Sequence, residues 1–371
     1  MADSPSTGVG ARQLTGAAIE DLDTPALLLD AEAFQRNLRR MADFFQGRKC
    51  RLRPHFKNHK CVELARRQQE AGSMIGFTCA KLSEAEVLAD AGRDNVLIAN
   101  QVVGRRKMAR LAELARRINV TLAVDHVDQI AAISEAAIAA KVTVGALVEI
   151  DIGMGRCGVP TGEPALDLAR EVMNRSGIEF RGLQAYEGHL VYLRDFDERA
   201  ARVRQAMARA VETRRMIERA GIPVGVISGG SSSTYRITAD IEGVDEIQAG
   251  TYPTMDWRYA ELAPEFEIAL SVLARVISVR PGEAVLDVGV KGVGDEFGLP
   301  RLKDYPTVEI PSFESEEHCI VHHAPAWNIG QTVHLIPSHA CTTCNLYRQM
   351  VIHQGDRVVD VWPIEGSGKL T

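Results

Sequence analysis

Residues 50–60 read Cys-Arg-Leu-Arg-Pro-His-Phe-Lys-Asn-His-Lys, a short strand pattern that runs into a basic loop ahead of a helical pattern. A strand that ends in a polar loop and is followed by a helix is the building unit of parallel α/β folds. In an extended segment alternate side chains share one face, so His55 and Lys57 are predicted to point the same way. A cationic neighbour or burial lowers the pKa of an amine, which predicts a reactive Lys57. A solvated basic turn is the alternative interpretation.

The strand-to-helix pattern of this segment repeats from Thr24 to about Gly250. The strand candidates are Ala26–Leu29, Cys50–Pro54, Met74–Cys79, Asn95–Ile98, Val120–Val124, Val144–Ile150, Glu179–Tyr186, Val224–Ile227 and Glu246–Gln248. Roughly eight or nine such units predict an α/β fold, a (β/α)8 TIM-type barrel. An open doubly wound sheet is the alternative. No Gly-x-Gly-x-x-Gly opens a helix after the first strand, which counts against a dinucleotide-binding fold.

The predicted secondary structure changes after Ala263. Helical patterns are replaced there by short strand patterns, separated by Gly, Pro and Asp. We therefore predict a smaller, mostly-β C-terminal domain at residues 260–371. The barrel is placed at residues 23–259. Residues 1–22 are polar at their start and rich in Gly, Ser and Thr, which predicts a flexible N-terminal arm rather than a secretion signal.

Composition excludes several classes of partner. The net charge is −6 at pH 7 and no basic tail exists, so nucleic acid is not an expected partner. No apolar run approaches the roughly 18 residues that a membrane-spanning helix needs. The seven cysteines are odd in number and mostly scattered, which favours a reducing, cytoplasmic location over a disulfide scaffold.

Three further segments stand where barrel enzymes carry their active groups, at the carboxyl ends of predicted strands. Residues 149–158 form a Gly-rich turn that presents Arg156, although an ordinary surface loop is the alternative. Residues 228–234, Ser-Gly-Gly-Ser-Ser-Ser-Thr, offer amides and hydroxyls that suit a phosphate, with a flexible loop as the alternative. Residues 248–252 are predicted to complete this cradle.

A different kind of site is predicted near the C-terminus. His339 and Cys341 are two residues apart, so both can face one metal if the segment is extended. Imidazole and thiolate suit Zn²⁺ with an open coordination position. Cys341 and Cys344 form a rival pair, for structural zinc or redox chemistry.

These segments together resemble the D-threonine aldolase and D-serine dehydratase family. The resemblance rests, in chain order, on Thr24-Pro-Ala-Leu-Leu-Leu-Asp, Arg53-Pro-His-Phe-Lys-Asn-His-Lys, Gly153-Met-Gly-Arg-Cys-Gly-Val, Ser228-Gly-Gly, Ala249-Gly-Thr-Tyr and Ser338-His-Ala-Cys. It covers nearly the whole chain from about residue 22. The family consists of pyridoxal phosphate enzymes with an alanine-racemase-like barrel and a C-terminal β domain.

The resemblance implies roles for individual residues. Lys57 would be the Schiff-base lysine, Arg156 would contact the phenolic oxygen of the cofactor and Tyr186 would lie near its ring. The other implied cofactor-binding residues are Ser228, Gly229, Gly230, Ser231, Gly250, Thr251 and Tyr252, with the neutral Gln248 where alanine racemases have an arginine. A neutral partner for the ring nitrogen disfavours racemisation. His339 and Cys341 would bind a divalent metal, zinc, manganese or magnesium.

The implied activity is that of a lyase on D-3-hydroxy-amino acids, with two versions. In the aldolase version His55 or a water on the metal removes the hydroxyl proton, and glycine and an aldehyde form. In the dehydratase version Lys57 takes the α-proton, and a keto acid and ammonia form. The family's aldolases carry His-x-Asp at the metal pair, whereas its dehydratases carry His-x-Cys, as here with Cys341.

The surrounding sequence favours the aldolase. Thr343-Cys-Asn and the Val361-Trp-Pro ending are closer to the aldolase and 3-hydroxyaspartate branch, so aldolase is the first expectation. A non-catalytic pyridoxal phosphate-binding protein is a remote alternative, because it would not need His339 and Cys341. A homodimer is expected from the resemblance alone.

Overall fold

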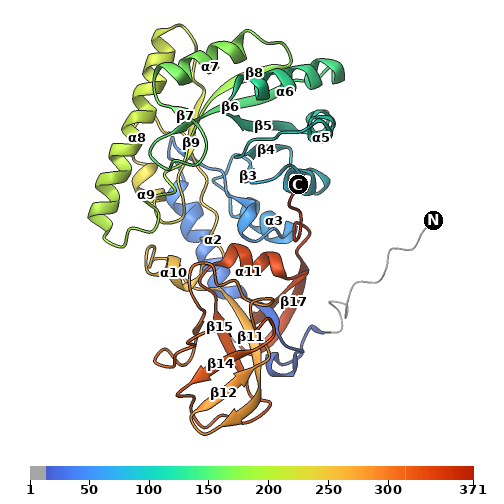
Figure 1. The fold of residues 1–371 in the computed structure, drawn as a ribbon. Coiled ribbons are helices and arrows are strands. Elements are labelled where there is room, and N and C mark those ends of the chain that lie inside the picture. Colours follow the sequence, from blue (N-terminus) through green and yellow to red (C-terminus); the bar gives the residue numbers. More distant parts are fainter. Residues whose placement is uncertain (1–13, 314) are drawn as a thin grey trace, which may run out of the picture. The chain divides into compact units, whose positions relative to one another are not determined.

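A computed structural model describes residues 14–313 and 315–371 (Figure 1). The chain divides into two compact units. One consists of Met1–Leu38 as far as it is described, Asn58–Leu64 and Pro253–Gly368. The other consists of Arg39–Lys57, Ala65–Tyr252 and Lys369–Thr371. We call them the β unit and the barrel unit.

The barrel unit is built on a parallel sheet in which each strand pairs with the next. The strand order is β2 (Arg51–Leu52), β10 (Glu246–Ile247), β9 (Val226–Gly229), β8 (Ile178–Ala185), β6 (Val144–Asp151), β5 (Asn119–Val124), β4 (Asn95–Ile98) and β3 (Phe77–Cys79), with β7 (Val159–Pro160) paired to β6. Bridges between Leu52 and Met74 and between His55 and Thr78 join the two ends of this order. The sheet therefore curls round as the predicted TIM-type barrel, which is confirmed.

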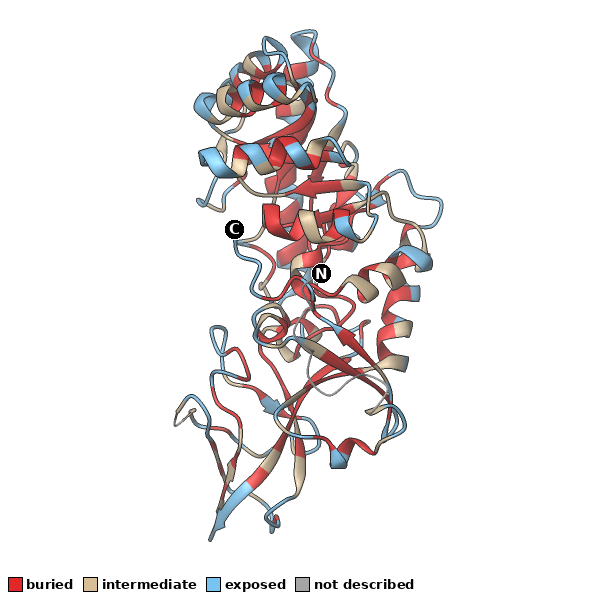
Figure 2. Cartoon of the chain, turned by 90° about the vertical axis from the view of Figure 1, so that its right-hand side faces the viewer, coloured by how far each residue is buried: buried red, intermediate tan, exposed pale blue. Residues whose placement is uncertain are grey.

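Helices flank the strands of this unit because the sheet is apolar on both faces. Seven of the eight residues of β6 are buried, which is typical of a parallel strand covered on both sides. The helices of this unit are α4 (Leu82–Asp90), α5 (Arg105–Ala115), α6 (Val127–Ala140), α7 (Glu163–Met173), α8 (Phe196–Arg219) and α9 (Tyr235–Thr238). The residues of α2 (Ala31–Phe45), α3 (Val62–Ala71) and the 3-10 turn η2 (Phe56–Asn58) are divided between the two units. Figure 2 shows buried strands and helices with exposed outer faces.

The β unit carries a mixed sheet. Its strands run in the order β13 (Arg301–Leu302), β15 (Thr332–Ile336), β11 (Leu270–Arg280), β1 (Ala26–Asp30), β16 (Gln349–Gln354) and β17 (Arg357–Pro363), while β12 (Glu283–Leu286) pairs with β11 and β14 (Cys319–His322). Two short helices, α10 (Trp257–Ala260) and α11 (Ala340–Leu346), and the 3-10 turn η1 (Ile19–Asp21) complete it. The predicted mostly-β C-terminal domain is confirmed.

Residues 26–30 form the predicted strand but lie in the other sheet. β1 pairs antiparallel with β11 and parallel with β16, and not with a barrel strand. Its three consecutive leucines are all buried, which suits a central strand of either sheet, so the pattern does not tell the two apart.

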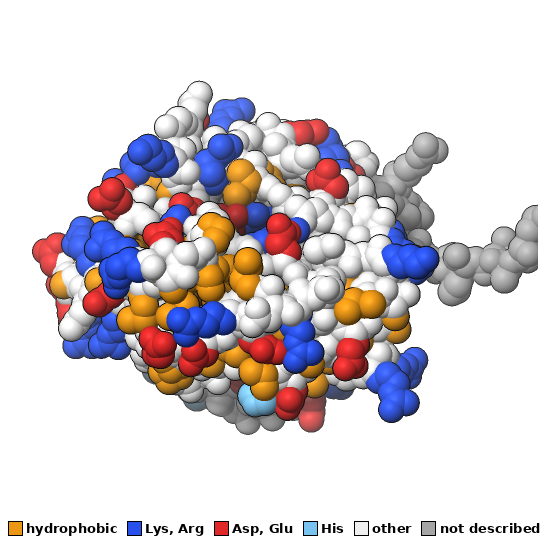
Figure 3. All heavy atoms as spheres, turned by 90° about the horizontal axis from the view of Figure 1, so that it is seen from above, with side chains coloured by type: hydrophobic (Ala, Val, Ile, Leu, Met, Phe, Trp, Pro, Cys, Tyr) orange, Lys and Arg blue, Asp and Glu red, His pale blue; other side chains and the backbone are white. Residues whose placement is uncertain are grey.

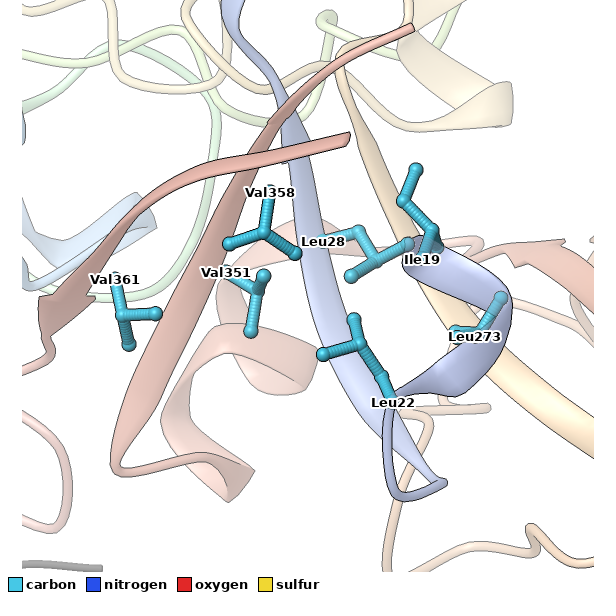
Figure 4. Close-up of a cluster of buried hydrophobic side chains, with 7 residues drawn as sticks. All are labelled: Ile19, Leu22, Leu28, Leu273, Val351, Val358 and Val361. Atoms are coloured by element: carbon cyan, nitrogen blue, oxygen red, sulfur yellow. The ribbon is translucent and has the colours of Figure 1, made fainter. Parts of the chain in front are cut away.

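Part of the predicted N-terminal arm is packed. Ile19 and Leu22 are buried in a cluster with strand residues of the β unit, where apolar contacts hold them (Figure 4). The cluster consists of Ile19, Leu22, Leu28, Leu273, Val351, Val358 and Val361. Residues 1–13 of the predicted arm lie outside the described residues.

The surface carries both signs of charge. Figure 3 shows Lys and Arg side chains interspersed with Asp and Glu on the face in view. No helix in the described part of the chain has the length and apolar character needed to cross a membrane.

Candidate active site

The predicted cofactor segments follow five neighbouring strands of the barrel sheet. In the strand order β2, β10, β9, β8, β6, the carboxyl ends lead to Lys57, Gln248–Tyr252, Gly230–Thr234, Tyr186 and Arg156. The N–H of His55 donates to the carbonyl of Ala249 at 3.0 Å, which fixes the first two segments side by side. Carboxyl ends of parallel strands meet at one edge, so the fold gathers all five segments there.

Lys57 lies in a 3-10 turn and not in the extended conformation predicted for residues 53–60. The ring Nδ1 of His55 accepts the backbone N–H of Lys57 at 3.3 Å, and this contact favours a turn over an extended strand. His55 is buried, whereas Lys57 is half-buried. Because Nδ1 acts as an acceptor, the neutral ring carries its proton on Nε2. His55 therefore orients the backbone of Lys57.

The predicted phosphate cradle is assembled by one serine. Ser232 Oγ accepts the backbone N–H of Thr251 at 2.9 Å and that of Tyr252 at 3.0 Å. The pairing of β9 with β10 brings these segments together. Gly229 is needed at this point, because a Cβ there would lie 2.0 Å from the carbonyl oxygen of Ala185.

A buried carboxylate beneath this loop was not predicted. Glu187 is fully buried and accepts three hydrogen bonds, from the Gly230 N–H at 3.0 Å, the Thr234 hydroxyl at 2.8 Å and the Thr238 hydroxyl at 2.7 Å. Three donors satisfy the buried charge and fix the loop in place. A single glutamate after a strand carries no sequence signal, so only the fold identifies it.

The side chain of Gln248 forms hydrogen bonds inside the barrel. Its Nε2 donates to Oε1 of Gln184 at 2.7 Å and to Oγ of Ser228 at 2.8 Å, and all three side chains are buried. An amide nitrogen has two hydrogens, and both are used here. Gln248 is neutral as predicted, but its hydrogens are directed at neighbouring strands. The Ser228 hydroxyl keeps its own hydrogen to donate.

The structure brings Arg156 and Tyr186 together, although they are far apart in sequence. The Arg156 guanidinium carbon lies 5.6 Å from the centre of the Tyr186 ring. Arg156 also lies 3.8 Å from the carboxylate of Glu149, which is buried. Burial raises the pKa of Glu149, while hydrogen bonding by Gln101 and the charge of Arg156 act against it.

The loop that presents Arg156 is fixed by its own backbone. The Asp151 carboxylate accepts the N–H groups of Gly153 and Met154 at 2.8 Å and that of Gly155 at 3.1 Å. Burial alone would raise the pKa of Asp151, but these hydrogen bonds outweigh it and the pKa is lowered. Gly158 has φ +101° and a Cβ there would lie 2.8 Å from the nitrogen of Asp151, so a glycine is required.

The predicted metal pair lies in the β unit at the start of α11. His339 is the N-cap residue, with extended backbone, and Cys341 lies in the first helical turn, so the segment is not extended throughout as predicted. The side chains nevertheless contact each other. Burial alone lowers the pKa of His339, but the charge and hydrogen bond of Cys341 outweigh it, and the pKa rises to about 9. Asn58, which follows Lys57 in the sequence, donates its amide to Cys341 Sγ at 3.6 Å.

Cys344, the other member of the rival pair with Cys341, is fully buried. Burial raises the pKa of its thiol well above the usual value. Among the described residues no group of three or more His, Cys, Asp or Glu side chains is placed to hold a metal. His339 and Cys341 offer an imidazole and a thiol, two donor types that suit Zn²⁺.

The donor set of the barrel unit fits pyridoxal phosphate. The hydroxyl-rich 230–234 and 250–252 segments suit the phosphate, and Lys57 suits the aldehyde carbon. Tyr186 and Arg156 follow β8 and β6, the next two strands along the same edge. This set therefore combines the amine of Lys57 with a hydroxyl-rich loop that suits an anion. It also includes three buried, uncharged polar side chains, those of Gln184, Ser228 and Gln248.

Two known protein families match the chain. Residues 29–256 match the family described as alanine racemase, N-terminal domain, and residues 269–353 match a putative serine dehydratase domain. A D-threonine aldolase of Arthrobacter sp is 36% identical over 95% of both chains. The chain belongs to the D-threonine aldolase and D-serine dehydratase family. The family is one of pyridoxal phosphate-dependent lyases, as the resemblance implied.

Other members of the family are similar along nearly their whole length. A 3-hydroxy-D-aspartate aldolase of Paracoccus denitrificans (strain Pd 1222) is 33% identical over 96% of this chain and 95% of its own. The crystal structure of D-threonine aldolase from Filomicrobium marinum superimposes with a TM-score of 0.93 at 38% identity, covering 96% of this chain and 99% of that one. A D-threo-3-hydroxyaspartate dehydratase from Delftia sp. HT23 gives a TM-score of 0.82 at 28% identity, over 93% and 98%.

Proposed function

We propose that this protein is a pyridoxal phosphate- and metal-dependent lyase that cleaves D-3-hydroxy-amino acids to glycine and an aldehyde, as a D-threonine aldolase does. The observation that carries the proposal is the similarity to D-threonine aldolases across both units, at 36% and 38% identity. The order of Lys57, the phosphate cradle, Tyr186 and Arg156 around one sheet edge supports it.

We assign the cofactor roles to the barrel unit. Pyridoxal phosphate, when bound, draws electrons from the α-carbon of an amino acid and so weakens the bonds to that carbon. Lys57 holds the cofactor, and His55 orients Lys57 through its backbone. Ser228, fixed by Gln248, is the neutral donor that we assign to the ring nitrogen. Arg156 carries the positive charge that we assign to the phenolic oxygen.

We assign the substrate hydroxyl to the β unit. His339 and Cys341 are the metal ligands in this proposal, and a divalent metal supplies Lewis acidity toward the hydroxyl oxygen. In the cleavage, the hydroxyl proton passes to a base, and the Cα–Cβ bond breaks with its electron pair remaining on the glycine fragment. A proton then adds to Cα, which gives glycine, and the β-carbon leaves as the aldehyde. His55 stays a predicted base, but its Nδ1 contact with Lys57 favours the orienting role.

A second candidate, the dehydratase reaction, is favoured by Cys341. The solved structures of D-threo-3-hydroxyaspartate dehydratase include a Cys-to-Ala variant in the metal-free form and a His-to-Ala variant. The substituted residues are two positions apart in that protein, the same spacing as His339 and Cys341. In this reaction Lys57 removes the α-proton and the β-hydroxyl leaves, which gives a 2-keto acid and ammonia.

Product analysis with D-threonine tests the proposal. The purified holoenzyme is expected to form acetaldehyde and glycine in equal amounts from D-threonine and neither from L-threonine. A chelator is expected to abolish the reaction and Zn²⁺ or Mn²⁺ to restore it. Formation of 2-oxobutanoate and ammonia instead, or pyruvate from D-serine, would replace the aldolase with the dehydratase. No product from either amino acid would refute both.

We also propose a cytoplasmic homodimer. All seven cysteines are free, which suits a reducing compartment. The dimer rests on the family resemblance, and light scattering of the purified holoenzyme tests it. A mass equal to that of one chain at working concentration would contradict the dimer.

A further inference from the structure

A carboxylate that no sequence motif marked lies against the predicted metal ligand His339. Oε1 of Glu296 is hydrogen-bonded to Nδ1 of His339. The Thr342 hydroxyl donates to the same oxygen and lies 3.3 Å from Nδ1 of His339. These three residues belong to the β unit, and His339 is largely shielded from solvent, with 20% of its side chain exposed.

This contact decides which nitrogen of His339 faces a metal. A histidine that donates its Nδ1–H to a carboxylate has only Nε2 left as a ligand. The same contact restricts rotation of the ring and makes Nε2 a stronger donor. A carboxylate behind a ligating histidine is the usual arrangement around bound metals, whereas a surface ion pair would leave the ring mobile.

The segment that carries Glu296 closes around the start of α11. Gly294 donates its N–H to the Thr343 hydroxyl at 3.2 Å, and a Cβ on Gly294 would lie 2.8 Å from the Thr342 hydroxyl. On the other side of Glu296, the Phe297 ring packs against the His339 ring with centres 4.8 Å apart. The Glu296 carboxylate and the Phe297 ring thus both restrain the imidazole of His339. The Gly294 backbone holds their segment against α11.

We propose that Glu296 is a positioning residue for the metal site, which holds His339 with Nε2 directed to the metal. The inference rests on the proposed metal dependence and adds to it a residue outside the His-x-Cys pair. Glu296 itself is not a ligand in this proposal, since its oxygen is occupied by His339 and Thr342. Its removal leaves both ligands in the sequence but no longer fixes the ring.

The test is the affinity of the holoenzyme for Zn²⁺ and Mn²⁺, measured by competition with a chromophoric chelator. Glu296→Ala is expected to weaken binding roughly 10- to 100-fold, as loss of a carboxylate behind a ligating histidine does. Glu296→Gln keeps an oxygen that accepts Nδ1–H, so a smaller loss is expected. Glu317→Gln is the matched control, because Glu317 pairs with Lys291 on the surface of the same unit.

A second variant keeps the test valid if Glu296→Ala does not fold. Thr342→Val removes only the hydroxyl that donates to Glu296, and a roughly two- to tenfold loss of metal affinity is expected. The melting temperature of the metal-free protein serves as a readout of structure. It is expected to stay unchanged in Glu296→Gln and Thr342→Val, while the metal affinity falls.

The outcomes separate this inference from the proposed function. Wild-type protein that binds neither ion refutes the metal dependence, and the role of Glu296 with it. Wild-type protein that binds metal, with Glu296→Ala and Thr342→Val within twofold of it, refutes the role of Glu296 and leaves the metal dependence standing. A fall in metal affinity that is accompanied by a lower melting temperature in the metal-free Glu296→Gln and Thr342→Val variants would make Glu296 a purely structural residue. That result would also overturn the inference.

Discussion

The side-chain amides of Gln248 and Gln184 face each other across the buried floor of the barrel unit, with Nε2 of Gln248 donating to Oε1 of Gln184 at 2.7 Å. Removing one amide leaves a buried hydrogen-bonding group of its partner unpaired, which costs about 1–3 kcal/mol. Removing both avoids that cost, and only the bond from Gln248 to Ser228 is then lost in addition. We expect Gln248→Met and Gln184→Met each to lower the free energy of unfolding by that amount. The double variant is expected to lose much less than the sum, measured by urea unfolding of the apoenzyme. Strict additivity would contradict this account of the pair.

Glu187 is expected to control cofactor affinity without touching the cofactor in our proposal. Glu187→Gln replaces an acceptor of three hydrogen bonds with a group that has only one oxygen, so the 230–234 loop loses order. We expect roughly tenfold weaker binding of pyridoxal phosphate, from loss of charge-assisted bonds worth about 1.5–3 kcal/mol each. Titration of the apoenzyme with cofactor measures it. Glu163→Gln, on the exposed start of α7, is the control. Equal affinities in the two variants would refute the role of Glu187.

Stability in mild acid is expected to depend on His334 in β15. Burial, together with the charge of Lys303, lowers the pKa of His334 to about 4, below the 6.5 of an unfolded histidine. The unfolded chain then binds a proton that the folded protein does not, so this stability is present above pH 6.5 and is lost as the pH falls toward 4. The slope is at most about 1.4 kcal/mol per pH unit.

Urea unfolding at several pH values checks this prediction. His334→Gln is expected to flatten the pH dependence between pH 4 and 6.5, while the exposed His318→Gln leaves it unchanged. An unchanged slope in His334→Gln would show that other groups cause the acid sensitivity.

The sequence predicted the barrel and the positions of its loops because a fully apolar strand pattern, followed by a helical pattern, repeats along the chain. β6 and β8 follow the predicted ranges closely. It did not predict the pairing of β1, because three consecutive leucines suit the middle of either sheet. A short apolar run specifies burial but not which partner provides it.

The local geometry of the site could not be predicted from the sequence either. The extended segment predicted for His55 and Lys57 is a turn, because the His55 ring accepts a backbone N–H two residues on. Glu187 and Glu296 are single carboxylates in loops with no motif around them, and their roles appear only once the chain folds back on them. Gln248 was recognised as neutral, but its partners are on two other strands.

The central claim is that Lys57, at the carboxyl end of β2, carries the pyridoxal phosphate of a lyase. Borohydride reduction makes a bond between cofactor and lysine permanent, and peptide mass spectrometry then locates it. We expect the pyridoxyl group on Lys57, and no labelled peptide in Lys57→Ala. The nearby Lys60, which is buried and donates to Asn345 at 2.7 Å, is the internal comparison. A label on Lys60 or any other lysine, or no label in the wild-type protein, would contradict the account.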